Sequence, residues 1–138
     1  MQPVLILDAE ALHALAQHRA RRALFERARA ILTAAHEMRA LVRVPAPILA
    51  ELYRGARFDP AIDRVLTDKG IKTMDLTPEI ARSAGHLLAQ ANLSSAYAVD
   101  AFVVATALTF PRAIIATGDP DDITRLAGGH TRLTVLAL

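Results

Sequence analysis

Four acidic residues in this chain stand beside apolar segments of the kind that form buried strands or helices, and carboxylates in such places can hold a cation. They are Asp8, Glu51, Asp100 and Asp119. In an open α/β sheet, ligands bind beyond the carboxyl ends of the strands, where these side chains would meet. Carboxylates gathered there repel one another unless a cation lies between them, and oxygen ligands suit Mg²⁺ or Mn²⁺. The pattern therefore predicts a metal-dependent hydrolase acting on phosphate esters.

Each of these acids also has a structural explanation, and the explanations differ in how well they fit. Asp8 and Asp119 each stand where a following helix needs an N-cap. Glu51 could pair with an arginine three residues later on the same helix. Asp100 is harder to explain in this way, because it lies within the apolar segment 98–104. A buried ionised carboxylate is costly unless it is paired or bound to a metal, so Asp100 favours a functional role.

Short apolar runs alternate with segments of helical periodicity, which predicts one α/β domain over residues 1–138. Strands are expected at residues 4–7, 42–44, 71–76, 113–117 and 133–136. Helices are expected at residues 9–17, 20–39, 45–55, 59–67, 97–110 and 120–126, with another that begins at Pro78 behind Thr77 as its N-cap. We expect Leu24, Ala28, Ile31, Ala35 and Met38 to form the buried face of the second helix. This alternation predicts a three-layer α/β/α sandwich around a mostly parallel sheet.

Composition favours a soluble protein of the cytoplasm. The chain has no cysteine and no apolar run near the ~18 residues that a membrane span needs, and its first residues carry no basic leader. The net charge of +2 does not by itself indicate a nucleic-acid partner, but half of the arginines lie between residues 19 and 43. A biased genome composition would also raise the arginine content. Arg21, Arg22 and Arg29 lie largely off the apolar face of their helix, so we expect them to contact the phosphate groups of a substrate.

The four acids and their surroundings resemble the PIN-domain family, and more narrowly the VapC-type ribonuclease toxins of bacterial toxin–antitoxin pairs. The segments that carry the resemblance are LILDAEAL, PAPILAELYRG, YAVDAFVVATAL and IIATGDPDDITRLA, which occur in this order and span nearly the whole chain. The resemblance implies that Asp8, Glu51, Asp100 and Asp119 are the catalytic acids and hold Mg²⁺ or Mn²⁺. It also implies RNA cleavage by two-metal-type phosphodiester hydrolysis, a homodimer, and an antitoxin protein that blocks the site.

The chain departs from the family pattern at Glu10, where a small hydroxylated residue usually follows the first aspartate by two positions. Glu10 is either an auxiliary metal ligand or a solvent-facing residue, and Asp122 is a second possible auxiliary acid. Two alternatives to a ribonuclease stay open. One is a phosphatase of another α/β family with Asp8 as nucleophile and Glu10 as acid, although such enzymes usually need a well-placed lysine. The other is a catalytically inactive PIN-like module that binds RNA or protein.

Overall fold

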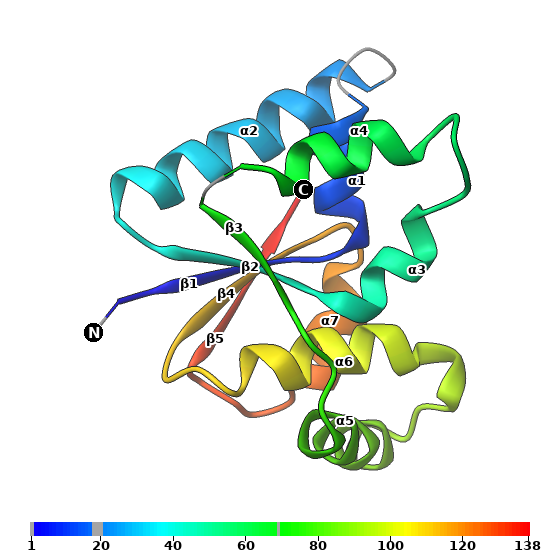
Figure 1. Ribbon diagram of the computed structural model, residues 1–138. Helices are drawn as coiled ribbons and strands as arrows, with labels where there is room; N and C mark the ends of the chain where they lie inside the picture. The colour runs from blue at the N-terminus through cyan, green and yellow to red at the C-terminus, as the bar shows by residue number, and fades with distance from the viewer. Residues whose placement is uncertain (1, 18–20, 69) are drawn as a thin grey trace.

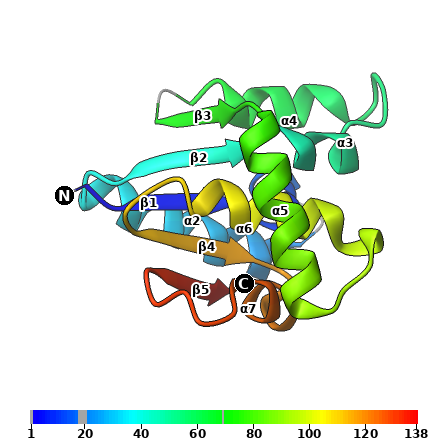
Figure 2. The same ribbon diagram turned by 90° about the horizontal axis from the view of Figure 1, so that it is seen from below.

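The computed structural model describes residues 2–17, 21–68 and 70–138 and contains a central sheet of five parallel strands (Figure 1). In chain order the strands are β1 Val4–Leu7, β2 Leu41–Pro45, β3 Ile71–Met74, β4 Ala113–Thr117 and β5 Leu133–Ala137. Their order across the sheet is β3-β2-β1-β4-β5. In register, Leu5 of β1 lies between Val42 of β2 and Ile114 of β4. Figure 2 shows that all the strands point the same way, so their carboxyl ends share one edge.

Helices cover both faces of this sheet, as the predicted three-layer sandwich requires (Figures 1 and 2). On one face lie α1 Ala9–Ala16, α2 Arg22–Glu37 and α4 Asp59–Leu66. On the other face lie α5 Pro78–Ala91, α6 Ala98–Ala107 and α7 Pro120–Ala127. Short helical segments follow β2 and precede α6, namely the 3₁₀ turn Ala46–Ile48, α3 Leu49–Leu52 and the 3₁₀ turn Ser95–Tyr97. The predicted fold class is confirmed, and the five strands are all parallel.

The strand order places a topological switch between β1 and β4. The chain first builds outward from β1 to β2 and β3, and it then returns through α5 and α6 to add β4 on the other side of β1. The loops that leave β1 and β4 therefore diverge to opposite faces, which opens a crevice at their carboxyl ends. Asp8 and Asp119 both follow these two strands, so the topology by itself brings them to the same crevice.

The core lies between the sheet and the helices on each side. Strand β1 is buried along its whole length, and Ile6 and Ile115 have no exposed surface. Because a parallel sheet is covered on both faces, its central strands are continuous apolar runs, which is why the sequence predicts them well. Several boundaries differ from the prediction. The helix after β2 ends at Leu52 rather than Gly55, β3 ends at Met74 rather than residue 76, and α6 ends at Ala107 rather than residue 110. The predicted start of α2 near residue 20 lies outside the described residues.

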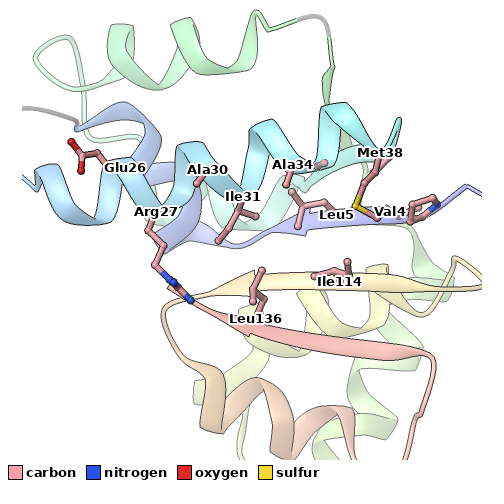
Figure 3. A pocket seen from close by; sticks show the side chains of 13 residues that line it. Val4, Leu5, Glu26, Arg27, Ala30, Ile31, Ala34, Met38, Ile114 and Leu136 are labelled. Atoms are coloured by element: carbon pink, nitrogen blue, oxygen red, sulfur yellow. The ribbon is translucent and has the colours of Figure 1, made fainter.

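Helix α2 buries a narrower face than its apolar pattern predicts. Ala28, Leu32 and Ala35 are its buried residues, whereas Met38 is 61% exposed, so the prediction that Met38 is buried is wrong. The helix ends at Glu37, which places Met38 beyond its last turn. Its flank and the open face of the strands enclose an apolar groove of about 590 Å³, to which Ile31, Ile114 and other residues contribute (Figure 3).

Candidate active site

Asp8 is fixed by hydrogen bonds on both carboxylate oxygens. Its Oδ1 accepts from the backbone N–H of Ala11 at 2.9 Å, which caps α1, and its Oδ2 accepts from the backbone N–H of Gly118 at 3.2 Å. Asp8 is only 4% exposed. Burial raises the pKa of Asp8, while hydrogen bonds from Thr117, Ala11 and Gly118 oppose the rise and the nearby Asp119 charge adds to it. Capping and a role in the crevice are thus compatible, as the sequence allowed.

Thr117 links Asp8 to Asp119, and sequence analysis missed it. Its side chain hydrogen-bonds Asp8, and its Oγ1 accepts from the backbone N–H of Asp119 at 2.8 Å. The residue is fully buried at the end of β4. A hydroxyl at the end of an otherwise apolar strand, two residues before an aspartate, was the available signal. Thr117 therefore supplies a hydroxyl between two acids, although Glu10 stands where the family pattern has one.

Asp119 occupies the N-cap position of α7, but its side chain makes no capping hydrogen bond. The prediction that Asp119 precedes a helix with Pro120 in the first turn is confirmed, whereas the capping contact itself is absent. Its carboxylate instead influences the other acids, because its charge raises the pKa of both Asp8 and Asp100. This leaves the Asp119 carboxylate available on the crevice side of the switch between β1 and β4.

Asp100 lies in the first turn of α6 and is half-buried. The pKa of Asp100 is raised to about 6, first by burial and then by the charges of Asp119, Asp8, Glu51 and Asp122, in that order. A carboxyl whose pKa is raised by four other acids has those acids close to it. The structure therefore places the carboxylates of Asp8, Glu51, Asp119 and Asp122 within electrostatic range of Asp100.

Glu51 reaches this region from α3 and is exposed. It does not pair with Arg54, whose Nη1 instead donates to the carbonyl oxygens of Ala50 and Tyr53. Glu51 and Glu10 both line a cleft between α1, α3 and α4. The simple explanation of Glu51 as half of a helical ion pair is therefore not supported.

The chemistry of these side chains suits a hard divalent cation. Among the described residues, no ion pair or hydrogen bond is recorded for the carboxylates of Glu51, Asp100 or Asp119, so their oxygens are open to a ligand. In the same described part of the chain, no three acidic or histidine side chains are grouped closely enough to hold a metal ion as they stand. Side-chain rotation would be needed to bring three oxygens onto one ion, whereas Asp8 is already fixed.

Residues 5–129 match the family model of the PIN domain. The chain belongs to the PIN domain family. Proteins of this family are nucleases and generally use divalent metal ions. No curated protein matches the chain in sequence. Among solved structures, the chain is similar in fold to a chain in the crystal structure of VapBC2 from Rickettsia felis bound to a DNA fragment from their promoter. The TM-score is 0.65 and the sequence identity is 12%, over 98% of each chain. The predicted PIN resemblance is thus confirmed.

In this PIN domain, Glu10 makes an ion pair across the crevice rim. Its Oε1 accepts from Arg21 Nη1 at 2.8 Å, and its side chain packs against Gly118, where an added Cβ would clash with Cβ and Cγ of Glu10. Only glycine therefore fits at position 118 while Glu10 keeps this position. The structure shows Glu10 engaged with Arg21, and its role as an auxiliary metal ligand stays a prediction.

The three arginines predicted to contact RNA are all exposed, as expected, but they differ in their neighbours. Arg21 pairs with Glu10, whereas Arg22 pairs with Glu26 one turn along α2 at 3.0 Å. Arg29 lines a separate hollow between α2 and α4. Of the three, Arg21 is the one placed beside an acid, Glu10.

No helix among the described residues is long and apolar enough to cross a membrane.

Proposed function

We propose that this PIN domain is a metal-dependent endoribonuclease that acts as the toxin of a toxin–antitoxin pair. The observation that carries the proposal is the position of Asp100. Its carboxyl has a pKa raised to about 6 by burial and by four other acids, at the topological switch of a domain whose family members are nucleases. Perturbed carboxyls in such a crevice are typical of catalytic sites.

Asp8, Glu51, Asp100 and Asp119 would hold Mg²⁺ or Mn²⁺ in this proposal. When bound, such ions supply positive charge that polarises a phosphodiester and promotes attack by water, with one or two ions present. Asp8 contributes a carboxylate whose orientation is set by Ala11 and Gly118. Asp100 contributes a carboxylate at the start of α6, where a positive charge would favour its ionised form. Glu10 and Asp122 are the auxiliary acids of the proposal.

RNA and an antitoxin protein are the proposed partners. The similarity to a chain of a VapBC2 complex, at 12% identity, concerns the fold, and it makes an antitoxin partner a reasonable part of the proposal. Arg21 next to the acids would contact an RNA phosphate, and Arg22 and Arg29 would add contacts along α2. A homodimer and a location in the cytoplasm complete the proposal and come from the family resemblance and the composition.

The structure gives less support to the phosphatase alternative. A nucleophilic aspartate needs an accessible oxygen, whereas both oxygens of Asp8 accept hydrogen bonds and the residue is almost fully buried. The proposed acid of that mechanism, Glu10, is held by Arg21. Of the two lysines, Lys72 is exposed on β3 and Lys69 lies outside the described residues. An inactive binding module is the second alternative, and the complete set of acids argues against it.

The experiment that tests the proposal compares RNA from cells after brief expression of the wild type and of Asp100→Asn. We expect new RNA 5′ ends at a restricted set of sites, together with arrest of growth, in the wild type alone. The purified proteins should repeat this difference on RNA in the presence of Mg²⁺ or Mn²⁺, and EDTA should abolish the wild-type cleavage. An Asp100→Asn protein that produces the same RNA ends at the same rate would contradict the proposal.

A further inference from the structure

A cleft of about 370 Å³ begins at the acids and runs between α1, α3 and α4. Glu10 and Glu51 belong to its lining, so the cleft is continuous with the proposed catalytic region. Leu52 and Ile62 give it an apolar part, and His13 gives it a ring with hydrogen-bonding nitrogens. The size falls within the usual range for small-molecule sites, roughly 300–1,000 Å³. An apolar hollow with polar edges fits a flat ligand that has the same character.

The cleft has an exposed aromatic side chain, which the core does not use. Phe58 is 46% exposed and lines the cleft, and the guanidinium carbon of Arg57 lies 5.9 Å from the centre of its ring. A ligand that covered this ring would gain the free energy of burying its exposed apolar surface.

The backbone around Phe58 is braced, so the ring is presented on a fixed turn. The Oδ1 atom of Asp59 accepts from the backbone N–H groups of Arg54 and Gly55, each at 3.0 Å. The N–H of Phe58 donates to the carbonyl of Gly55 at 2.9 Å. Gly55 has a φ of +112°, a conformation that a side chain would strain. A preorganised aromatic loses little conformational entropy when a ligand binds to it.

We propose that this cleft is a base-binding subsite for single-stranded RNA, in which a base near the cut stacks on Phe58 and Arg57 contacts a neighbouring phosphate. A nucleobase has the required flat faces and polar edges, and bases stack on aromatic side chains in many single-strand-binding proteins. A guanidinium over the ring adds a cation beside the stacked base, where the RNA backbone must pass. The inference rests on the proposed ribonuclease function and adds a subsite to it.

The chain has no tryptophan, so Phe58→Trp introduces a single fluorescent reporter into the cleft. In EDTA, where no cleavage occurs, a short single-stranded RNA of mixed sequence should quench this tryptophan. An oligomer of the same length that carries ribose and phosphate without bases should not. The matched control is Met38→Trp, which is exposed at the opposite end of the strands and should respond to neither oligomer. Equal responses at the two positions, or quenching by the base-free oligomer, would overturn the proposal.

Affinity gives a second test that needs no tryptophan. Loss of stacking on one base should weaken RNA binding by Phe58→Ala between about fivefold and a hundredfold in EDTA. Phe58→Tyr keeps the ring and should bind within about twofold of the wild type, while Phe58→Leu, which keeps only apolar volume, should bind more weakly. All three should melt close to the wild-type temperature, because the side chain lies outside the core.

Unchanged RNA affinity in Phe58→Ala would overturn the proposed subsite. The same conclusion would follow if Phe58→Ala weakened the binding of a protein partner and left RNA binding unchanged. These outcomes are independent of the catalytic proposal, which depends on Asp100→Asn. If Asp100→Asn abolishes cleavage while Phe58→Ala binds RNA normally, the nuclease function stands and the subsite fails. If Asp100→Asn still cleaves, the nuclease assignment of the acids fails, whatever Phe58 does.

Discussion

The acid crevice lies beyond the carboxyl end of β1, whereas the apolar groove beside α2 runs along the sheet from the first residues of β1 to Leu136 of β5. The groove, of about 590 Å³, is lined by Val4, Leu5 and other apolar side chains, with Glu26 and Arg27 as its charged members (Figure 3). The cleft lined by Glu10 and Glu51 is smaller, at about 370 Å³, but it adjoins carboxylates whose charges act on one another. Arg27 uses its guanidinium to bind the carbonyl oxygen of Ala137 and so ties α2 to the end of β5. Size therefore does not identify the site of chemistry, whereas fixed polar groups do.

The two regions also contribute to stability with opposite signs. Side chains at the groove are part of the core, and their removal exposes or hollows it. The acids of the crevice repel one another and are partly desolvated, which disfavours the folded protein when they are ionised. We therefore expect groove substitutions to lower the free energy of unfolding without altering chemistry. Crevice substitutions should abolish chemistry and, except at Asp8, should not lower the free energy of unfolding.

The largest effect on stability is expected from Leu5→Ala. Leu5 is 2% exposed and lies at the boundary of the core and the groove. Its truncation should lower the free energy of unfolding by about 2–3 kcal/mol, at the low end for leucine because one side of the new space opens to the groove. Urea melts measure this loss. RNA cleavage per folded molecule should be unchanged, and a large fall in cleavage would break the separation between the two regions.

Asp8 is both a crevice acid and a helix cap that stabilises the fold. Comparing Asp8→Ala with Asp100→Ala therefore separates these two roles. In Asp8→Ala, the N–H groups of Ala11 and Gly118 lose their acceptor, and the free energy of unfolding should fall by about 1–2 kcal/mol. Relief of the buried charge opposes this loss without cancelling it. Within the described part of the chain the carboxylate of Asp100 makes no hydrogen bond, so Asp100→Ala should leave the free energy of unfolding equal or higher. Matching losses in the two variants would show that Asp100 also has a structural role.

The pH dependence of stability should reveal Asp100 in metal-free protein. The pKa of Asp100 is raised to about 6 in the folded state. Protonation of Asp100 therefore favours the folded state, and this contribution is fully present at a pH below the pKa that Asp100 has in the unfolded state. It is lost as the pH rises through about 6. Between pH 4 and 7.5, Asp100→Asn should therefore gain on the wild type by on the order of 1 kcal/mol, after allowance for solvent screening. Melts at each pH give this difference. A constant difference across the range would contradict the raised pKa.

The smallest effect is expected at the rim, where Arg21 pairs with Glu10. Both side chains are about half exposed, so Glu10→Gln should change the free energy of unfolding by less than about 1 kcal/mol.

If Arg21 contacts RNA, Arg21→Gln should weaken RNA binding and flatten its dependence on salt. Arg82→Gln is the matched control, because Arg82 is exposed on α5, on the other face of the sheet, and is not among the proposed RNA contacts. Identical salt slopes in the two variants would make Arg21 an ordinary surface residue.

The sequence predicted the sheet and the place of Asp8 and Asp119 beside it well for a physical reason. Central parallel strands are short, apolar and bounded by polar residues, so the ends of β1 and β4 are visible in the sequence, and an acid within two residues of such an end must lie near the carboxyl edge of the sheet. Thr77 was predicted as the cap of α5 in the same way, and its Oγ1 accepts from the N–H of Ile80 at 3.2 Å. These features depend on local pattern and topology alone.

Other features depend on contacts between distant residues, which a single sequence does not specify. The packing of Glu10 on Gly118 and the link from Thr117 to Asp8 join residues about 110 positions apart. The exposure of Phe58 was equally invisible, because an aromatic next to a helix start is usually buried. Met38 was misplaced since helical periodicity carries no information about where the helix ends.

The most direct test of the account is a metal titration followed by melting temperature, with the wild type and Asp100→Asn side by side. Mg²⁺ or Mn²⁺ should raise the melting temperature of the wild type, because a ligand that binds only the folded state stabilises it. The metal-free variant should melt at the wild-type temperature or above it, and metal should shift it little or not at all. A variant that shifts as far as the wild type and still cleaves RNA would contradict the assignment of Asp100 and the proposed metal site.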